Sequence, residues 1–239
     1  MNGLSLKTIF AFASLPVLTA IAGGAIAVVR PPGAKFRSYI QHFAAGVVFS
    51  VVAVELLPDI VKRHLPWEVA IGFGAGVAFM LFLKKVAARI EGSSKSGSLG
   101  LLMGVAIDIL IDGILVGISF SAGTKEGILL TIALAIELLS LGLAVAASLM
   151  KSGVARGKTV WIVTSLAALI LIGTLTGATL LQAVSGEILE VALAFGLAAL
   201  LFLVTEELLV EAHEEPETPT ATAMFFGGFL LFLIIGMVS

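Results

Sequence analysis

Long apolar stretches alternate with short polar connections along the whole chain. Eight of these stretches are long enough to cross a bilayer, since a transmembrane helix needs about 20 apolar residues. They cover residues 6–29, 38–61, 67–88, 99–121, 126–150, 158–182, 187–211 and 220–238. Proline, glycine and serine gather in the connections, as expected where helices end. The pattern predicts an all-α polytopic membrane protein with eight transmembrane helices in one membrane domain, residues 1–239.

The composition supports this class. Hydrophobic residues make up 59% of the chain and charged residues 13%, and the mean hydropathy is +1.14. These values are far from those of an ordinary soluble domain. There is no cysteine, so disulfides and thiolate metal ligands are excluded. We expect the lipid bilayer as a partner, and we expect neither a cofactor nor a nucleic-acid partner.

Lysine and arginine predict the orientation. Most of them lie in or beside the connections after the first, third and fifth stretches, and the exceptions are Lys7, Lys62, Arg63 and Lys125. The positive-inside rule therefore makes those three connections cytosolic. We expect an integral protein of a prokaryotic plasma membrane, with both termini extracytoplasmic.

A short pattern occurs twice in the chain. Phe43, Val52 and Glu55-Leu56-Leu57 of the second stretch recur with equal spacing as Phe195, Val204 and Glu207-Leu208-Leu209 of the seventh. The two stretches would cross the bilayer in opposite directions. The pattern therefore predicts an inverted repeat, the arrangement that many secondary transporters use for alternating access.

Three carboxylates lie in the apolar middle of two consecutive stretches. Asp108 and Asp112 are in the fourth stretch and Glu137 is in the fifth, with no Lys or Arg at the same depth. A carboxylate at the bilayer centre costs about 3 kcal/mol on insertion scales, so such residues usually mark an ion or proton path. Four residues apart, Asp108 and Asp112 share a helix face. The three side chains predict a cation site between the fourth and fifth helices.

The residues around these acids resemble a known family. The segments Ala106-Ile107-Asp108-Ile109-Leu110-Ile111-Asp112-Gly113 and Ala135-Ile136-Glu137-Leu138-Leu139-Ser140-Leu141-Gly142 look like degenerate forms of the HNxPEG signatures of the ZIP family of metal-ion transporters. Two other stretches are also similar to that family. They are the second, with Ala45-Gly46 and Glu55-Leu56-Leu57-Pro58, and the seventh, with Glu206-Glu207-Leu208-Leu209 and Glu211-Ala212-His213. The resemblance implies a ZIP-like bundle that transports a divalent metal (zinc, iron or manganese) as a homodimer, with helices 1, 4, 5 and 6 as the metal-carrying unit.

The chain departs from the family pattern at the metal positions. Asp108 and Asp112 stand where the family has His and Glu, and Glu137 stands at a His or Gln position. Leu141 replaces the second acid, and Ile109 and Leu138 replace residues that help hold a second metal in some members. The resemblance therefore implies one metal ion. Oxygen-only ligands favour hard ions, which puts Mn²⁺ or Fe²⁺ slightly ahead of Zn²⁺.

Five further residues are candidates for entrance or exit ligands, and each also fits a solvated interfacial position. They are Glu55, Glu206, Glu207, Glu211 and His213. For the three central acids, the alternative is that they are protonated and join helices by hydrogen bonds. Other functions that fit the sequence are a proton- or sodium-coupled carrier of another substrate and a transport-inactive ZIP-like protein. An enzyme is disfavoured, because the chain has neither a GxGD nor an HExxH motif.

Overall fold

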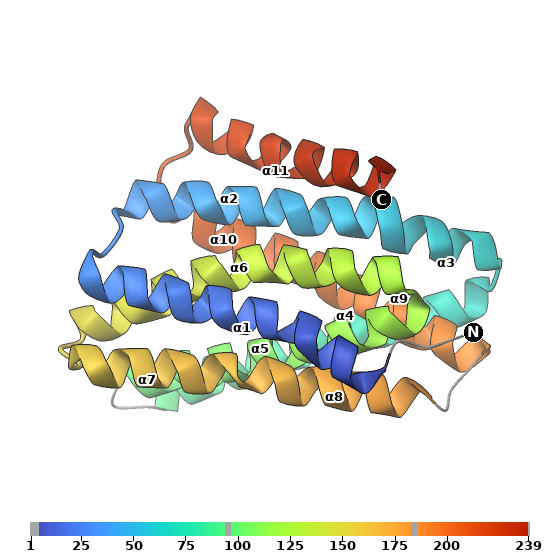
Figure 1. The fold of residues 1–239 in the computed structure, drawn as a ribbon, viewed down its shortest axis with the longest axis horizontal. Coiled ribbons are helices and arrows are strands. Elements are labelled where there is room, and N and C mark those ends of the chain that lie inside the picture. Colours follow the sequence, from blue (N-terminus) through green and yellow to red (C-terminus); the bar gives the residue numbers. More distant parts are fainter. Residues whose placement is uncertain (1–4, 94–96, 183–185, 239) are drawn as a thin grey trace.

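The computed structural model describes residues 5–93, 97–182 and 186–238, and this part of the chain is helical without a strand. Eight helical segments are long and apolar enough to cross a membrane, as the hydropathy pattern predicts (Figure 1). The protein is thus an all-α polytopic membrane protein. In chain order the helices are α1 (Leu6–Val29), α2 (Ala34–Val51), η1 (Val52–Leu56), α3 (Leu57–Arg63), α4 (Pro66–Ser93), α5 (Gly97–Ala122), α6 (Thr124–Lys151), α7 (Arg156–Ala167), α8 (Leu169–Gln182), α9 (Glu187–Phe202), η2 (Leu203–Leu208), α10 (Leu209–Ala212) and α11 (Pro219–Val238).

Several helices extend past the apolar stretches that predict them. The second span begins at Ala34, directly after the extended residue Gly33, and α4 continues to Ser93. Hydropathy detects the part of a helix that suits a bilayer, whereas backbone hydrogen bonding continues into the polar flanks. The sixth span consists of two helices, α7 and α8, which meet at Ala168. In α5 and α6, Ile111 and Ser140 stand at the proline positions of the HNxPEG signature that these segments resemble, and the helices run without interruption.

Four pairs of helices pack most closely: α1 with α6, α5 with α8, α2 with α11, and α4 with α9. Glycines allow the close approach in each pair. A Cβ atom on Gly23 of α1 would collide with the Leu139 carbonyl oxygen of α6, and one on Gly142 of α6 would collide with the Ala20 carbonyl oxygen of α1. Small residues commonly let membrane helices touch in this way.

The predicted repeat has structural counterparts. The π-helical segments η1 and η2 begin at Val52 and Leu203 and contain the equivalent residues Glu55 and Glu207. Gly228 of α11 packs on the Phe43 carbonyl group, and Gly76 of α4 makes the equivalent contact with that of Phe195. These glycines have the same sequence spacing as the two phenylalanines. Equivalent contacts in both halves are what an inverted repeat predicts. Gly76, with Gly72, therefore packs α4 on α9 inside the chain.

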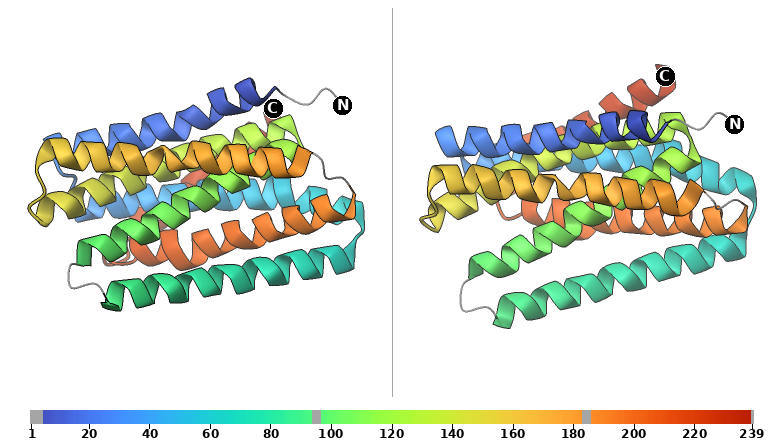
Figure 2. Two further views of the ribbon diagram at one scale, coloured as in Figure 1. Left: turned by 90° about the horizontal axis from the view of Figure 1, so that it is seen from below. Right: turned by 60° about the horizontal axis from the view of Figure 1, so that its bottom comes forward.

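The helices are assigned here to two groups, following the metal-carrying unit that the family resemblance predicts. Block 1 is defined as α1, α5, α6, α7 and α8, and block 2 contains the other helices. Each close pair lies within one block, and α6 packs about as closely on α2 of block 2 as on α5 of block 1. Between the blocks, α2 lies beside α6 and α5 beside α4 and α9, as two views of the bundle show (Figure 2).

The two ends of the bundle are also distinct. The turns at residues 30–33, 152–155 and 213–218 share one end, called here the vestibule end. The turns at 64–65 and 123 share the other, with the ends of α1 and α11 that are nearest the chain termini (Figure 1). We call this the terminal end. It is the vestibule end that the positive-inside rule predicts to be cytosolic.

Candidate metal centre

Asp108, Asp112 and Glu137 lie together between α5 and α6. One carboxylate oxygen from each can be chosen so that all lie within 4.8 Å of one another. Asp112 and Glu137 are each only 2% exposed, and Asp108 is partly buried. The four-residue spacing places both aspartates on the face of α5 that meets Glu137. The structure thus brings together the three acids that the sequence singles out.

Two oxygens of this cluster are buried without a hydrogen-bond partner in the described part of the chain: Oδ2 of Asp112 and Oε2 of Glu137. None of the ion pairs between described residues involves the three acids. Buried polar atoms are nearly always paired, and an unpaired carboxylate in an apolar medium is costly. A cation between the three side chains would supply the missing charge and the missing bonds.

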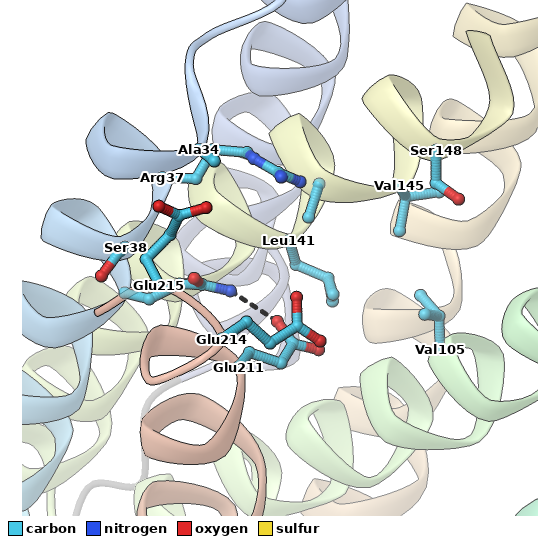
Figure 3. A pocket seen from close by; sticks show the side chains of 12 residues that line it. Ala34, Arg37, Ser38, Val105, Leu141, Val145, Ser148, Glu211, Glu214 and Glu215 are labelled. Carbon is cyan, nitrogen blue, oxygen red and sulfur yellow. Dashed lines mark hydrogen bonds between the residues drawn. The ribbon is translucent and has the colours of Figure 1, made fainter. Parts of the chain in front are cut away.

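A route of neighbouring cavities extends from the vestibule end to Asp108 and Glu137. At its mouth is a cavity of about 250 Å³ lined by Arg37, Glu211 and Glu214 among others (Figure 3). A second cavity of about 250 Å³ reaches Asp108 beside α4. A small cavity of about 20 Å³ touches both Asp108 and Glu137. Glu211 and Leu141 line all three, so these cavities are neighbours along one path.

Three of the predicted path residues lie along this route. Glu207 comes from η2, and its carboxyl group is within hydrogen-bonding reach of Asp108. Glu211, one turn further, accepts a hydrogen bond of 2.5 Å from Nε2 of Gln41. Glu206 lines the second cavity and pairs with Lys84 at 2.6 Å. A π-helix is rare and often marks a functional site, and η2 aims two of these glutamates at the route.

The other two predicted path residues lie elsewhere. His213 is exposed, pairs with Glu217 at 2.8 Å and contacts the ring of His42. It is not among the residues that line the three cavities. Glu55 lies toward the terminal end, where Lys125 approaches it to 3.3 Å. In this conformation Glu55 is bound to a lysine and does not face the three acids.

The positions that would hold a second metal are apolar in space as well as in sequence. Ile109 is 3% exposed and Leu138 is fully buried. With Leu141 they line a cavity of about 10 Å³ that contains no carboxylate. Among the described residues of α5 and α6, the three acids are therefore the one group that could hold a metal ion.

Sequence reasoning missed two polar residues near the centre. Gln41 of α2 lines both the mouth and the cavity of about 20 Å³, and Ser140 of α6 lines the latter cavity beside Glu137. Gln41 is a 6% exposed amide in a membrane-spanning helix. The reasoning that marked the acids, a polar group inside an apolar stretch, would have found it.

The route is closed on the side of the terminal end. Leu115 and Val116 follow Asp112 by one turn on α5, and Leu130 and Leu134 precede Glu137 on α6. All four are at most 2% exposed, and they belong to one apolar core cluster. Asp108 and Glu137 therefore face cavities on the side of the vestibule end, and packed apolar side chains lie between the three acids and the other end.

Comparisons with known proteins do not assign the chain to a family. No protein-family model matches it, and no curated protein is similar to it. The resemblance to ZIP transporters therefore depends on the motif residues and remains a prediction.

Proposed function

We propose that the protein carries a divalent metal cation across the membrane through the site formed by Asp108, Asp112 and Glu137. The observation that carries this proposal is the convergence of three carboxylates in the membrane interior, two of which each have a buried oxygen without a partner among the described residues. A divalent ion supplies two positive charges and accepts several oxygen ligands at once. Structural hydrogen bonding between helices would not need three acids at one point.

The ligand chemistry favours the harder ions. The side chains that line the cavity of about 20 Å³ beside Asp108 and Glu137 are carboxylates, an amide, a hydroxyl and leucines. None of them is an imidazole or contains sulfur. Carboxylate and carbonyl oxygens suit Mn²⁺ and Mg²⁺, whereas zinc sites usually include histidine or cysteine. We therefore propose manganese or iron as cargo ahead of zinc. The ion would bind weakly enough to be released, as a transport site requires.

Alternating access is the mechanism that the architecture favours. The acids communicate with the vestibule end through the cavities beside Glu211, while the leucines around Leu134 cover them toward the terminal end. Glycine contacts join the close helix pairs inside each block, and none of the glycine-to-backbone contacts among described residues joins helices of different blocks. A rocking or sliding of block 1 against block 2 would expose the acids to each end in turn.

The decisive experiment is metal uptake into proteoliposomes by the Asp112→Asn variant. Asparagine at this position would keep the size of the side chain and lose its charge, so we expect uptake to fall to the rate of protein-free liposomes. Asp59→Asn is the matched control, because Asp59 pairs with Lys62 on the surface of the terminal end and should transport normally. Uptake by Asp112→Asn at the wild-type rate would refute the site.

A second measurement separates loss of binding from loss of folding. A ligand that binds only the folded state raises the unfolding midpoint. Mn²⁺ should therefore raise the midpoint of the wild type and of Asp59→Asn, and leave that of Asp112→Asn unchanged while all three elute as the same species in gel filtration.

A further inference from the structure

A charged contact joins the two blocks at the terminal end. Lys125, the second residue of α6, belongs to block 1. Its ammonium group lies 3.3 Å from Oε1 of Glu55 in η1 and donates a hydrogen bond of 2.8 Å to the carbonyl oxygen of Gly236 in α11. Both of these partners belong to block 2.

The contact is favourable for both partners of the lysine. Glu55 is only 9% exposed, so its carboxylate needs a cation nearby. Gly236 lies in the last turn of α11, where carbonyl oxygens lack a partner within the helix. A positive charge at a helix C-terminus also interacts well with the helix dipole. One ammonium group thus serves a carboxylate and a helix end together.

Gly236 has a further part in this contact. A Cβ atom at this position would lie 2.7 Å from Oε1 of Glu55. The absence of a side chain therefore leaves the space that the carboxylate occupies. A side chain at Gly236 would require the carboxylate of Glu55 to shift, which the end of this flexible side chain can do at little cost, so the change disturbs the contact mildly and leaves Lys125 intact.

The other ion pairs between described residues do not join the blocks. Those of Lys62 with Asp59 and of His213 with Glu217 are local, and those of Arg63 with Glu190 and of Lys84 with Glu206 lie within block 2. Among the ion pairs of the described part of the chain, that of Lys125 with Glu55 is the one that crosses between the blocks. It is also remote from the acids, since the twelve residues from Lys125 to Glu137 span about 18 Å of helix.

We propose that Lys125, Glu55 and the Gly236 carbonyl group form a latch that holds the terminal end closed, and that the blocks separate at this end only when the latch opens. The inference relies on the proposed alternating movement. It does not depend on the identity of the ion or on the three acids, so it can be tested in metal-free protein.

The experiment uses the absence of native cysteines. Ser119→Cys places a thiol on the α5 face that carries Asp112, toward the terminal end, at a site that is 3% exposed. Ser148→Cys places a thiol in the cavity at the mouth of the route, at the vestibule end. Each reporter is combined with Lys125→Met, with Gly236→Ala, with the conservative change Lys125→Arg, or with Lys62→Met, which removes an exposed lysine at the same end. The rate of reaction with a charged maleimide is measured on purified, metal-free protein.

Opening of the latch should move the two reporters in opposite directions. With Lys125→Met, we expect the thiol of the Ser119→Cys reporter to react about tenfold faster, because hydrogen bonds to charged groups contribute roughly a factor of ten in an equilibrium constant. Gly236→Ala should raise this rate by a smaller factor. The vestibule reporter should react more slowly, whereas Lys125→Arg and Lys62→Met should change neither rate.

Two results would overturn the latch. An unchanged rate at the Ser119→Cys reporter in both disrupting variants would show that the contact does not control closure. Faster reaction at both reporters would show general loosening, and hence a purely structural contact. If Lys125→Met fails to fold, Glu55→Gln, which removes the charge of the other partner, decides the question in its place. A protein that passes this test but transports no metal would refute the proposed function and leave the latch standing.

Discussion

At the scale of single residues, the depth of a charge in the membrane was the informative quantity. It identified Asp108, Asp112 and Glu137, which the structure brings within 4.8 Å of one another. The depth of a residue in the membrane does not, however, tell which helix its side chain faces. Glu55 and Glu207 occupy equivalent places in the repeat, yet Glu207 approaches Asp108 and Glu55 is bound by Lys125. Which partner such a residue meets depends on the packing of helices distant in sequence, and a single stretch does not contain that information.

The apolar residues beside the acids lead to a prediction of stoichiometry. Since Ile109, Leu138 and Leu141 fill the second-metal positions with hydrocarbon, we expect one Mn²⁺ per protomer at the buried acids. Calorimetry on a variant that lacks surface ligands, His213→Ala with Glu217→Gln, should give a ratio of one. A second ion of equal affinity that disappears with Glu137→Gln would contradict this assignment.

At the scale of helices, hydropathy predicted where the spans lie, because burial in lipid demands a continuous apolar stretch. It did not predict the π-helical segments η1 and η2, since one extra residue in a turn leaves hydropathy unchanged. Hydropathy also did not predict which helices pack against each other. Small residues such as Gly72 and Gly76 suit close helix packing, but whether they meet α9 or a second copy of the chain can be decided only in three dimensions.

The glycine contacts predict a contrast between two substitutions. A Cβ atom on Gly177 would collide with the Ile114 carbonyl oxygen, whereas one on Gly74 would meet no atom within 4 Å. Gly177→Ala must push α8 away from α5, at a cost of about 1–3 kcal/mol for overpacking. Gly74→Ala should be neutral or stabilise its helix by up to about 1 kcal/mol.

The measurement is the thermal unfolding midpoint of the two purified variants in the same detergent. We expect Gly177→Ala to unfold several degrees below the wild type and Gly74→Ala to match or exceed it. Equal midpoints for both would mean that α5 and α8 separate at no cost, and that their backbones are not in the close contact described above.

At the scale of the whole molecule, the orientation in the membrane decides from which side the three acids can be reached. The lysines and arginines favour a cytosolic vestibule end. Ser152→Cys at that end and Lys62→Cys at the terminal end test this in intact cells, because both positions are exposed. We expect a membrane-impermeant maleimide to label Lys62→Cys without lysis and Ser152→Cys only after lysis. The reverse pattern would invert the topology and place the open route outside.

The equivalence of η1 and η2 has a consequence for the state that the structure does not contain. In an inverted repeat whose halves differ in conformation, each half can adopt the conformation of the other. For this chain, such an exchange predicts a protein open at the terminal end, in which Glu55 faces the three acids and Glu207 turns away from them. The form open at the vestibule end therefore predicts a specific second conformation.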